Sequence, residues 1–534
     1  MKFLVHPVGF IVPSKPVSQL YLVEDNWNDW FTYKTMYTLY YVDEDSEKHL
    51  IGSVKIGQLD MDKEMMRPDI PSDFEKLSDD YFSLGQDVSY YSNLHSLGDD
   101  TRHNILDALN DIALKPTVYE KARYYDVTVN SLMRNVRHTS VTGQYRRLAN
   151  GNAKLTNYKF TYTGPNIRGV ERVNLSFEVN PRSNPPTNIH VLIGRNAVGK
   201  THMINNMINS LIDQNSSEDK AGFFSTVSDE ISKEDLFANV VSVSFSAFDQ
   251  TEPLPERRGN SDGIPYSYVG LKKIKKKNQK ELPPKSPENL KQEFASSLHA
   301  IKSSSKTTRW LRAIEMLTAD PIFKEADVAS ILRPLENDNI IDESKDKQTT
   351  DVFDRESDDD ILLKQRAQHF FHRLSSGHKI VLLTLTRLVE TVEERTLVLL
   401  DEPEAHLHPP LLSAFTRALS DLLISRNAVA IIATHSPVIL QEVPRSCVWK
   451  LRRSGTTLQY SRTEIETFGE NIGALTREIF ELEVTYSGFY KMLKDAVDKI
   501  GDYNRILEHF NNELGREARG IVRALLASKN REDE

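Results

Sequence analysis

The sequence has a single cysteine, Cys447, among its 534 residues. One thiol excludes an intramolecular disulfide framework and a cysteine-rich metal site, which is typical of a protein from a reducing compartment. Long apolar runs are also missing, since the longest fall far short of the roughly 18 to 20 residues of a membrane-spanning helix. The apolar start MKFLVHPVGFIV is interrupted by His6 and Pro7, so it fits a β-strand better than a signal peptide. We therefore expect a cytoplasmic protein.

An excess of positive charge is lacking as well. Acidic residues outnumber basic ones by 76 to 67, and the formal net charge is −9, which excludes a surface that attracts nucleic acid as a whole. One local run, LKKIKKKNQK at Leu271–Lys280, is either a contact for nucleic acid or a partner, or simply a solvated face. The composition, 39% hydrophobic and 27% charged, is ordinary for a globular chain. At this length, two to four compact units are expected.

Internal repeats and sustained heptads are absent from the sequence, but its composition changes several times. The pattern of β-branched, helical and charged stretches predicts six segments. They are a β-rich part of an N-terminal lobe (1–60), a helical insertion (61–150), a core part with a glycine loop (151–251), a charged, partly helical insertion with a mobile loop (252–364), a second core part (365–463) and a helical C-terminal region (464–534).

The stretch IHVLIGRNAVGKT matches the phosphate-loop pattern G-x-x-x-x-G-K-[ST] between an apolar strand and a helix. In such a loop the backbone N–H groups and the helix N-terminus bind phosphate, Lys200 neutralises the β and γ phosphates, and the Thr201 hydroxyl binds Mg²⁺. The alternative is a tight turn without a ligand. The sequence therefore predicts an ATP and Mg²⁺ site formed by Gly194, Arg195, Asn196, Ala197, Val198, Gly199, Lys200 and Thr201.

A second apolar strand, TLVLL, ends in two adjacent carboxylates, Asp401 and Glu402. The carboxyl edge of a parallel sheet is where ligands of open α/β folds bind. Asp401 is expected to hold Mg²⁺ through water, and Glu402 to polarise the attacking water as general base. An acidic turn after a core strand is the simpler alternative.

Three histidines follow these carboxylates. His435 ends the strand AVAIIAT, where it either reaches a γ-phosphate oxygen or packs as a helix-capping residue. His406 and His408 form an H-x-H pair just past the acidic turn; without cysteine or further ligands, we interpret it as an interface loop rather than a metal site.

The order of these parts, with the turn LSSGHK at Leu374–Lys379 between the phosphate loop and the acidic strand, resembles ABC-type ATPases. The resemblance implies an α/β fold of the ABC-type P-loop ATPases, with a mixed or parallel core sheet. It also implies that Ser375 and Gly377 form a signature motif contacting the γ-phosphate of ATP on a second subunit, in a homodimer or higher homo-oligomer. Gln250, after SFSAFD, stands about where that family keeps a glutamine contacting Mg²⁺. His378 stands where glutamine is common.

Among ABC-type ATPases, transporter subunits do not explain the two ends of the chain, and repair ATPases have long heptad insertions. The overcoming-lysogenization-defect nucleases share DEPEAHLHPP and ATHSP, but carry a Toprim domain whose carboxylates we do not find. The chain resembles the PtuA family, the ATPases of Septu and retron anti-phage systems. The resemblance lies in LVEDNWNDWFTYKTMYTLYYV and LIGSVKIG near the start, and in GRNAVGKT, SFSAFD, LSSGHK and GENIGALTREIF. This resemblance implies a PtuB-like HNH nuclease as partner and, in retrons, a reverse transcriptase with its RNA–DNA hybrid (msDNA).

Two other functions stay open at this point. One is an ATPase that tethers or repairs DNA directly, which predicts ATPase stimulation by bare DNA and salt-sensitive binding without a partner. The other is an enzyme that cuts nucleic acid itself, against which the missing carboxylate cluster argues. The pair Asp60 and Asp62 is better explained as a turn.

Overall fold

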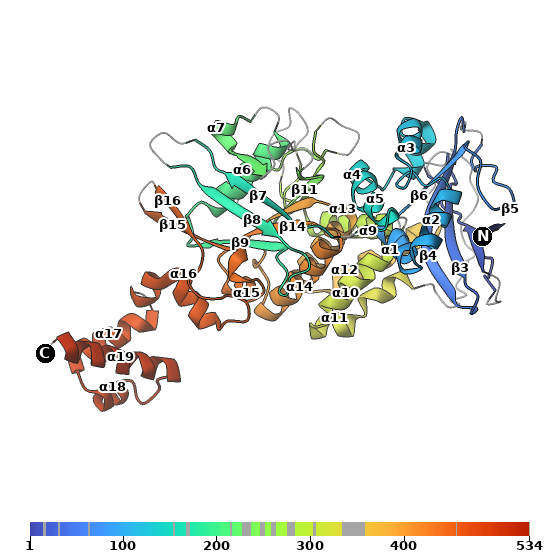
Figure 1. Ribbon diagram of the computed structural model, residues 1–534. Helices are drawn as coiled ribbons and strands as arrows, with labels where there is room; N and C mark the ends of the chain where they lie inside the picture. Colours follow the sequence, from blue (N-terminus) through green and yellow to red (C-terminus); the bar gives the residue numbers. More distant parts are fainter. Residues whose placement is uncertain are drawn as a thin grey trace.

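The computed structural model shows an N-terminal lobe, a central sheet with helices on both sides, and a C-terminal group of helices (Figure 1). It describes residues 1–13, 18–29, 32–61, 65–152, 155–166, 171–213, 216–226, 236–245, 251–257, 263–274, 283–302, 306–333, 358–454, 457–486 and 488–532.

The N-terminal lobe is built on a six-stranded sheet with the order β5-β1-β2-β3-β4-β6. Its strands are β1 (Lys2–His6), β2 (Gln19–Glu24), β3 (Met36–Val42), β4 (Lys48–Gln58), β5 (Asp73–Phe74) and β6 (Tyr81–Gly85). The first four strands lie where the sequence predicts a β-rich segment. Strands β5 and β6 come from the segment expected to be a helical insertion.

The helices of residues 61–150 cover this sheet rather than standing apart from it. They are α1 (Val88–Ser96), α2 (Asp99–Ala108), α3 (Pro116–Ala122), α4 (His138–Ser140) and α5 (Arg146–Ala149), with π-helical turns at Thr128–Leu132 and Val141–Tyr145. One hydrophobic core runs from Phe3 on the first strand to Ala149 on α5. The predicted boundary at residue 60 therefore falls within a single folded lobe.

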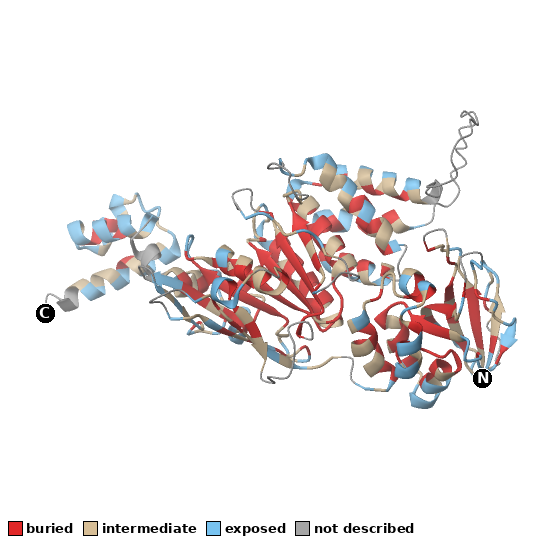
Figure 2. Cartoon of the chain, turned by 90° about the horizontal axis from the view of Figure 1, so that it is seen from above, coloured by how far each residue is buried: buried red, intermediate tan, exposed pale blue. Residues whose placement is uncertain are grey.

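The central sheet has seven strands in the order β12-β11-β13-β14-β9-β15-β16, all parallel except β16. Its strands are β9 (Ile189–Gly194), β11 (Asn239–Ser244), β12 (Tyr266–Gly270), β13 (Thr396–Asp401), β14 (Val429–Thr434), β15 (Val448–Ser454) and β16 (Thr457–Ser461). Every residue of β9, β13 and β14 is buried, as expected for parallel strands covered on both faces (Figure 2). The α/β class with a mixed or parallel core sheet is thus confirmed.

One face of this sheet packs against a layer that contains two helices and a second sheet of order β10-β7-β8. This layer consists of α6 (Lys200–Ile212), α7 (Glu218–Ala221), β7 (Tyr158–Thr163), β8 (Asn174–Val179) and β10 (Phe223–Thr226). Its aromatic residues pack against Leu192 of β9 and Leu399 of β13. This packing holds α6, the helix that follows the glycine loop, against the sheet.

The other face carries the longest helices of the core (Figure 1). They are α9 (Pro287–Lys302), α10 (Thr307–Leu317), α11 (Pro321–Ala326), α12 (Asp358–Arg373), α13 (Ser376–Thr391), α14 (Pro409–Ser425) and α15 (Pro437–Leu440), with 3₁₀ turns at Val328–Leu332 and Arg445–Cys447. The segment 252–364, predicted as an insertion, contributes β12 to the sheet edge and α9 to α11 to this face. The described part of this segment packs into the hydrophobic core on this face.

The C-terminal region is helical in its described part, with α16 (Ile472–Tyr486), α17 (Gly488–Ile500), α18 (Tyr503–His509) and α19 (Arg516–Glu532). The last three helices share a small core of their own around Leu493, Val497 and Ile506. They extend away from the central sheet and are largely exposed (Figure 2). Across all described residues, the helices are too short or too polar to cross a membrane.

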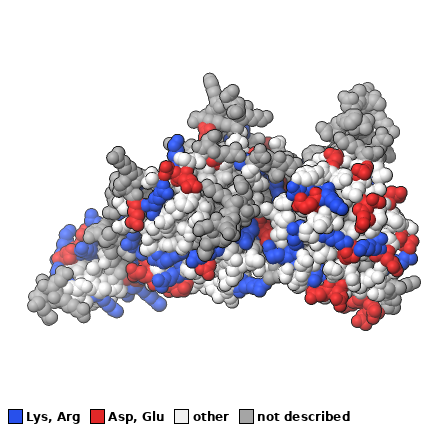
Figure 3. All heavy atoms as spheres, turned by 45° about the horizontal axis from the view of Figure 1, so that its top comes forward, with Lys and Arg blue, Asp and Glu red and all other residues white. Residues whose placement is uncertain are grey.

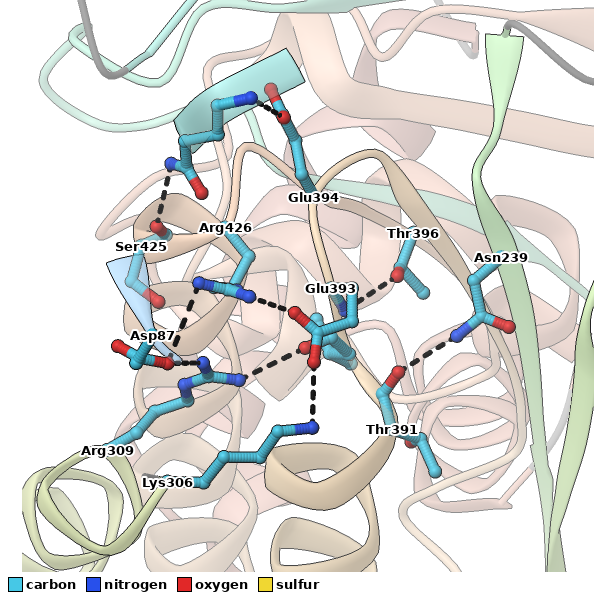
Figure 4. A network of polar contacts seen from close by, with 12 residues as sticks. Asp87, Asn239, Lys306, Arg309, Thr391, Glu393, Glu394, Thr396, Ser425 and Arg426 are labelled. Atoms are coloured by element: carbon cyan, nitrogen blue, oxygen red, sulfur yellow. Dashed lines mark hydrogen bonds and ion pairs between the residues drawn. The ribbon is translucent and has the colours of Figure 1, made fainter. Parts of the chain in front are cut away.

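Buried charges join the N-terminal lobe to the core (Figure 4). Glu393, in the turn between α13 and β13, pairs with Arg426 at the end of α14 and with Lys306 before α10 at 2.7 Å. Arg309 of α10 pairs with Asp87, which caps α1 of the N-terminal lobe. The side chain of Glu393 is 5% exposed and that of Arg426 is 1% exposed. Three parts of the chain thus meet in one buried ionic network.

Charges on the surface are mixed in sign. On the face drawn in Figure 3, lysines and arginines alternate with aspartates and glutamates in small groups. The basic run Leu271–Lys280, interpreted either as a contact or as a solvated face, is described only as far as Ile274, so most of it lies outside the described residues.

Candidate functional site

Three strands of the central sheet end side by side. In the order β13-β14-β9, Asp401 stands opposite Ala433, and Thr434 stands opposite Ile193. Because parallel strands in register end at the same edge, the glycine loop after β9, the acidic pair after β13 and His435 after β14 meet there. The topology therefore brings together motifs that lie up to 240 residues apart in the chain.

The glycine loop leads into α6 through a left-handed turn. Gly199 has φ of +104°, a conformation that a residue without Cβ adopts without strain. The Lys200 side chain folds back over the loop, where Nζ donates hydrogen bonds to the carbonyls of Gly194 and Arg195, each at 3.0 Å. Burial lowers the pKa of Lys200, while the carboxylates of Glu402, Glu404 and Asp401 act in the opposite direction. A cation is thus held where phosphates would enter.

The two carboxylates after β13 have different surroundings. Asp401 is buried and accepts a hydrogen bond from the Thr201 hydroxyl at 3.0 Å, so the hydroxyl and carboxylate expected to bind Mg²⁺ are adjacent. Glu402 has φ of +47°, a left-handed conformation that is uncommon for a residue with a side chain and clusters at functional sites. Its N–H donates to the carbonyl of Ala433 at 2.9 Å, which fixes this turn against β14.

His435 is held by a residue that the sequence reasoning missed. Glu404 Oε1 lies 3.1 Å from His435 Nδ1 and also accepts the His435 backbone N–H at 2.8 Å. It accepts the Thr434 hydroxyl at 2.6 Å as well. Glu402 Oε1 lies 3.7 Å from the same ring nitrogen. Glu404 therefore orients the imidazole, and its place two residues after the acidic pair is the signal that could have indicated it.

A pocket of about 630 Å³ opens at this edge of the sheet. Its lining includes seven of the predicted residues, namely Asn196, Ala197, Gly199, Lys200, Thr201, Glu402 and His435. The other lining residues are His202, Asn205, Asn206, Asn209 and Thr251. The asparagines on α6 were not predicted, because asparagines on a helix give no pattern of their own. Gln250 lies outside the described residues, although its neighbour Thr251 lines the pocket.

The turn LSSGHK lies at the start of α13. Ser375 is the N-cap of this helix and is exposed, while Leu374 is buried. A Cβ at Gly377 would meet the carbonyl oxygen of His406 at 2.6 Å, so the close packing of this turn on the loop before α14 requires glycine. Within the described part of the chain, the pocket lining includes neither Ser375 nor Gly377. In a single chain, the LSSGHK turn therefore lies apart from the pocket that the phosphate loop lines.

His406 and His408, predicted to form an interface loop, make different contacts in the structure. His406 contributes its backbone to the packing on Gly377. His408 caps α14 and its Nε2 lies 3.6 Å from Asp320, which in turn contacts His378. Asp320, His378 and His408 place three potential metal-ligand atoms within 4.8 Å of one another. However, Asp320 Oδ1 already accepts two backbone N–H groups of α11, and His408 Nδ1 accepts one of α14. These side chains therefore act as helix caps, which accounts for their positions without a metal ion.

Together, the sheet order, the phosphate loop, the acidic pair and the histidine define an ATPase domain with the mixed α/β fold of the ABC-type P-loop ATPases. A family model described as "AAA domain, putative AbiEii toxin, Type IV TA system" matches residues 189–441, which contain the phosphate loop, the acidic pair and the histidine.

The whole chain has a curated relative. It is 40% identical over 539 residues to protein ea59 of Escherichia phage lambda, and the match covers 99% of each chain. The chain belongs to the same family as this phage protein.

Solved structures give only a loose likeness. An ATP-binding cassette of an ABC transporter in its ADP conformation is 12% identical with a TM-score of 0.30, over 62% of this chain and 99% of that one. The protein cbiO1 of Clostridium perfringens, part of an ABC transporter complex, is 13% identical with a TM-score of 0.28, over 66% of this chain and all of that one. The fold assignment rests on the strand order and the loop geometry above.

Replacing Lys200 by alanine should abolish nucleotide binding. Lys200 can offer two charge-assisted hydrogen bonds to phosphates, each contributing about 1.5–3 kcal/mol, so the affinity for ATP should fall about 100-fold or more. Binding of a fluorescent ATP analogue measures this loss, with the exposed Lys159 of β7 replaced by alanine as the control. Retained affinity in a folded Lys200→Ala protein would disprove the phosphate-loop assignment.

Proposed function

We propose that this chain is an ATP-hydrolysing switch in which two copies close around ATP and the closed state governs a separate nuclease. The observation that carries the proposal is the separation of two parts of one ATPase site. One chain offers a pocket with a phosphate loop, carboxylates and a histidine, while its exposed Ser375 turn lies outside that pocket. A second copy would supply the missing turn.

The residues divide the chemistry as follows. Lys200 and the N-terminus of α6 bind the phosphates, and Thr201 with Asp401 would hold Mg²⁺, which supplies positive charge to the phosphoryl oxygens when bound. Glu402 takes the proton of the attacking water as general base. His435, oriented by Glu404, donates a hydrogen bond to the γ-phosphate from the ring nitrogen that faces away from the carboxylate.

ATP then acts as a bridge, because it contacts the phosphate loop of one copy and Ser375 and Gly377 of the other. Differential binding of ATP to the closed pair shifts the population toward closure, and hydrolysis reverses it. Gln250 would assist at Mg²⁺, by the resemblance to ABC-type ATPases alone.

The partner proposal rests on the resemblance to the PtuA family. We assign to this ATPase a PtuB-like HNH nuclease and, in the retron form, a reverse transcriptase with its RNA–DNA hybrid. The described C-terminal helices α17 to α19, which extend from the core with a surface of their own, offer area for such a partner. The lambda relative is a phage protein, so the switch is proposed without assigning it to a host or a phage genome.

The test is the mass in solution of the Glu402→Gln protein with and without ATP and Mg²⁺, alone and with a PtuB-like HNH protein. The variant should form a dimer or higher assembly with ATP, and the HNH protein should co-migrate with it. Ser375→Arg, placed in the same background, should block association while single-chain ATP binding persists.

Different outcomes overturn different parts of the proposal. A Glu402→Gln protein that stays monomeric with saturating ATP contradicts the two-chain site. A dimer that ignores the HNH protein but binds bare duplex DNA, with ATPase stimulated by DNA, would favour direct DNA tethering instead.

A further inference from the structure

A buried relay stands directly behind Ser375. The Ser375 hydroxyl lies 2.6 Å from His378 Nδ1, and His378 Nε2 lies 3.1 Å from Asp320 Oδ1. The side chains of His378 and Asp320 are each 3% exposed, whereas Ser375 is exposed. Asp320 immediately precedes α11 and lies 55 positions upstream of Ser375. A residue of the segment 252–364 thus supports the LSSGHK turn at Leu374–Lys379, called the signature turn below.

The polarity of this relay can be worked out from its far end. Burial would raise the pKa of Asp320, but the hydrogen bond from His378 and the N–H groups of Phe323 and Ile322 outweigh it and hold the pKa below its usual value. Asp320 is therefore a carboxylate at neutral pH and can only accept hydrogen bonds. It follows that His378 Nε2 carries a proton and donates a hydrogen bond to Asp320.

Whether His378 Nδ1 carries a proton then determines where the Ser375 hydroxyl can donate its hydrogen bond. In a neutral ring Nδ1 is an acceptor, so the Ser375 hydroxyl must donate its single proton inward. In an imidazolium Nδ1–H donates to the Ser375 oxygen, and the hydroxyl proton becomes available to a phosphate oxygen outside. Only the protonated ring thus leaves Ser375 free to donate to a facing nucleotide.

We propose that His378, held by Asp320, is a proton-linked positioning residue, so that closure of two chains around ATP takes up one proton at each signature turn. The proposal rests on the two-chain site proposed above and adds a regulatory variable to it, namely pH. The nucleotide carries negative charge at its γ-phosphate, and a buried imidazolium one hydroxyl away stabilises that charge through space as well as through Ser375.

The surroundings of His378 suit this role. Two titratable groups contact this histidine in the described part of the chain. Asp320 faces it from the start of α11 with its carboxylate 3.1 Å from Nε2, and His408 faces it from the start of α14 with ring centroids 6.2 Å apart. Phe323 covers the ring at 5.0 Å, edge to face, and excludes water. His408 Nδ1 accepts the N–H of Leu411 and makes no hydrogen bond to the relay from that nitrogen, so removal of His408 should not weaken the effect.

The experiment follows ATP-driven dimerisation of the Glu402→Gln protein by sedimentation between pH 6 and pH 8, with Mg²⁺-ATP saturating throughout. The dimerisation constant should increase about 10-fold or more from pH 8 to pH 6, because uptake of one proton per site makes association depend on pH. Calorimetry in buffers of different ionisation enthalpy should show net proton uptake on closure.

Three variants in the same background make the test specific. His378→Gln, which restores the residue common in ABC-type ATPases, should still dimerise but lose the proton uptake and most of the pH dependence. Asp320→Asn, which can still cap α11, should shift the dependence to lower pH. His408→Ser, which can still cap α14, should retain it, and each variant's fold is checked by thermal unfolding.

Different outcomes would contradict the two-chain ATP site and the proton relay. If the Glu402→Gln protein does not dimerise at any pH, the two-chain site itself fails. If it dimerises equally well across the range, or if His378→Gln keeps the same pH dependence, only the proton relay is wrong. Loss of dimerisation with a chelator selective for Zn²⁺, and its recovery with Zn²⁺ alone, would overturn the relay in favour of a metal on Asp320, His378 and His408.

Discussion

Glutamine in place of Glu402 is expected to lower the rate of ATP hydrolysis by about 100- to 10,000-fold, the contribution usually made by a general base, while ATP affinity stays nearly unchanged. Glu402 is 31% exposed at the pocket and its backbone is held in a left-handed turn against β14. A carboxamide has almost the same shape but cannot take a proton from water. Single-turnover hydrolysis with excess protein measures the chemical step directly.

The control for this prediction is Glu315→Gln, on the exposed face of α10 and away from the pocket. It should hydrolyse ATP at the parent rate. Normal turnover in Glu402→Gln would remove Glu402 as the base and leave Glu404 as the next carboxylate to replace. A variant that loses ATP binding as well would point to a disturbed turn, because the φ of +47° at this position must be kept for the loop to stay in place.

The parts of the site that the sequence predicts are those in which one short stretch carries both the chemistry and its placement. Gly194 to Thr201 follows a strand and opens a helix, and Asp401 and Glu402 end another strand. Once the sheet is known to be parallel, the meeting of these residues at one edge follows from geometry alone.

The missed residues depend on contacts between distant segments. Asp320 supports Ser375 from a region that looks like a charged insertion, and no spacing in the sequence relates the two. The strand β6 within residues 61–150 was missed for the same reason, because its pairing with β4 joins residues that are distant in the sequence. Local patterns predict elements well, whereas tertiary packing decides which of them share a core.

Breaking the buried network around Glu393 is expected to be the most destabilising change of a charged residue discussed for this chain. Glu393→Gln leaves Arg426, 1% exposed, with only the more distant carboxylate of Asp87 at 3.9 Å, and removing one partner of a buried pair costs about 3–5 kcal/mol. The free energy of unfolding in urea measures the loss. The surface pair of exposed Arg312 and partly exposed Asp421 is the control, since Asp421→Asn there should cost about 0–1 kcal/mol.

A double variant shows whether the network acts as a unit. Arg426→Met combined with Glu393→Gln removes both charges, so it should lose less than the sum of the two single changes. Glu393 lies in the turn between α13, which begins at the signature turn, and β13, which ends at Asp401. Additive losses would mean that the two side chains stabilise the fold independently, in spite of their contact.

The contribution of Glu393 should also depend on pH, in a direction that its pKa sets. Burial alone would raise this pKa, but the charges of Arg426 and Lys306 hold it below its usual value. A glutamate in the unfolded chain binds its proton near pH 4.3, so the stabilisation is complete above that pH and is lost as the pH falls through the folded value. The difference in unfolding free energy between the parent and Glu393→Gln should therefore be constant at neutral pH and shrink below about pH 4. A difference that persists unchanged in acid would assign the effect to packing rather than to charge.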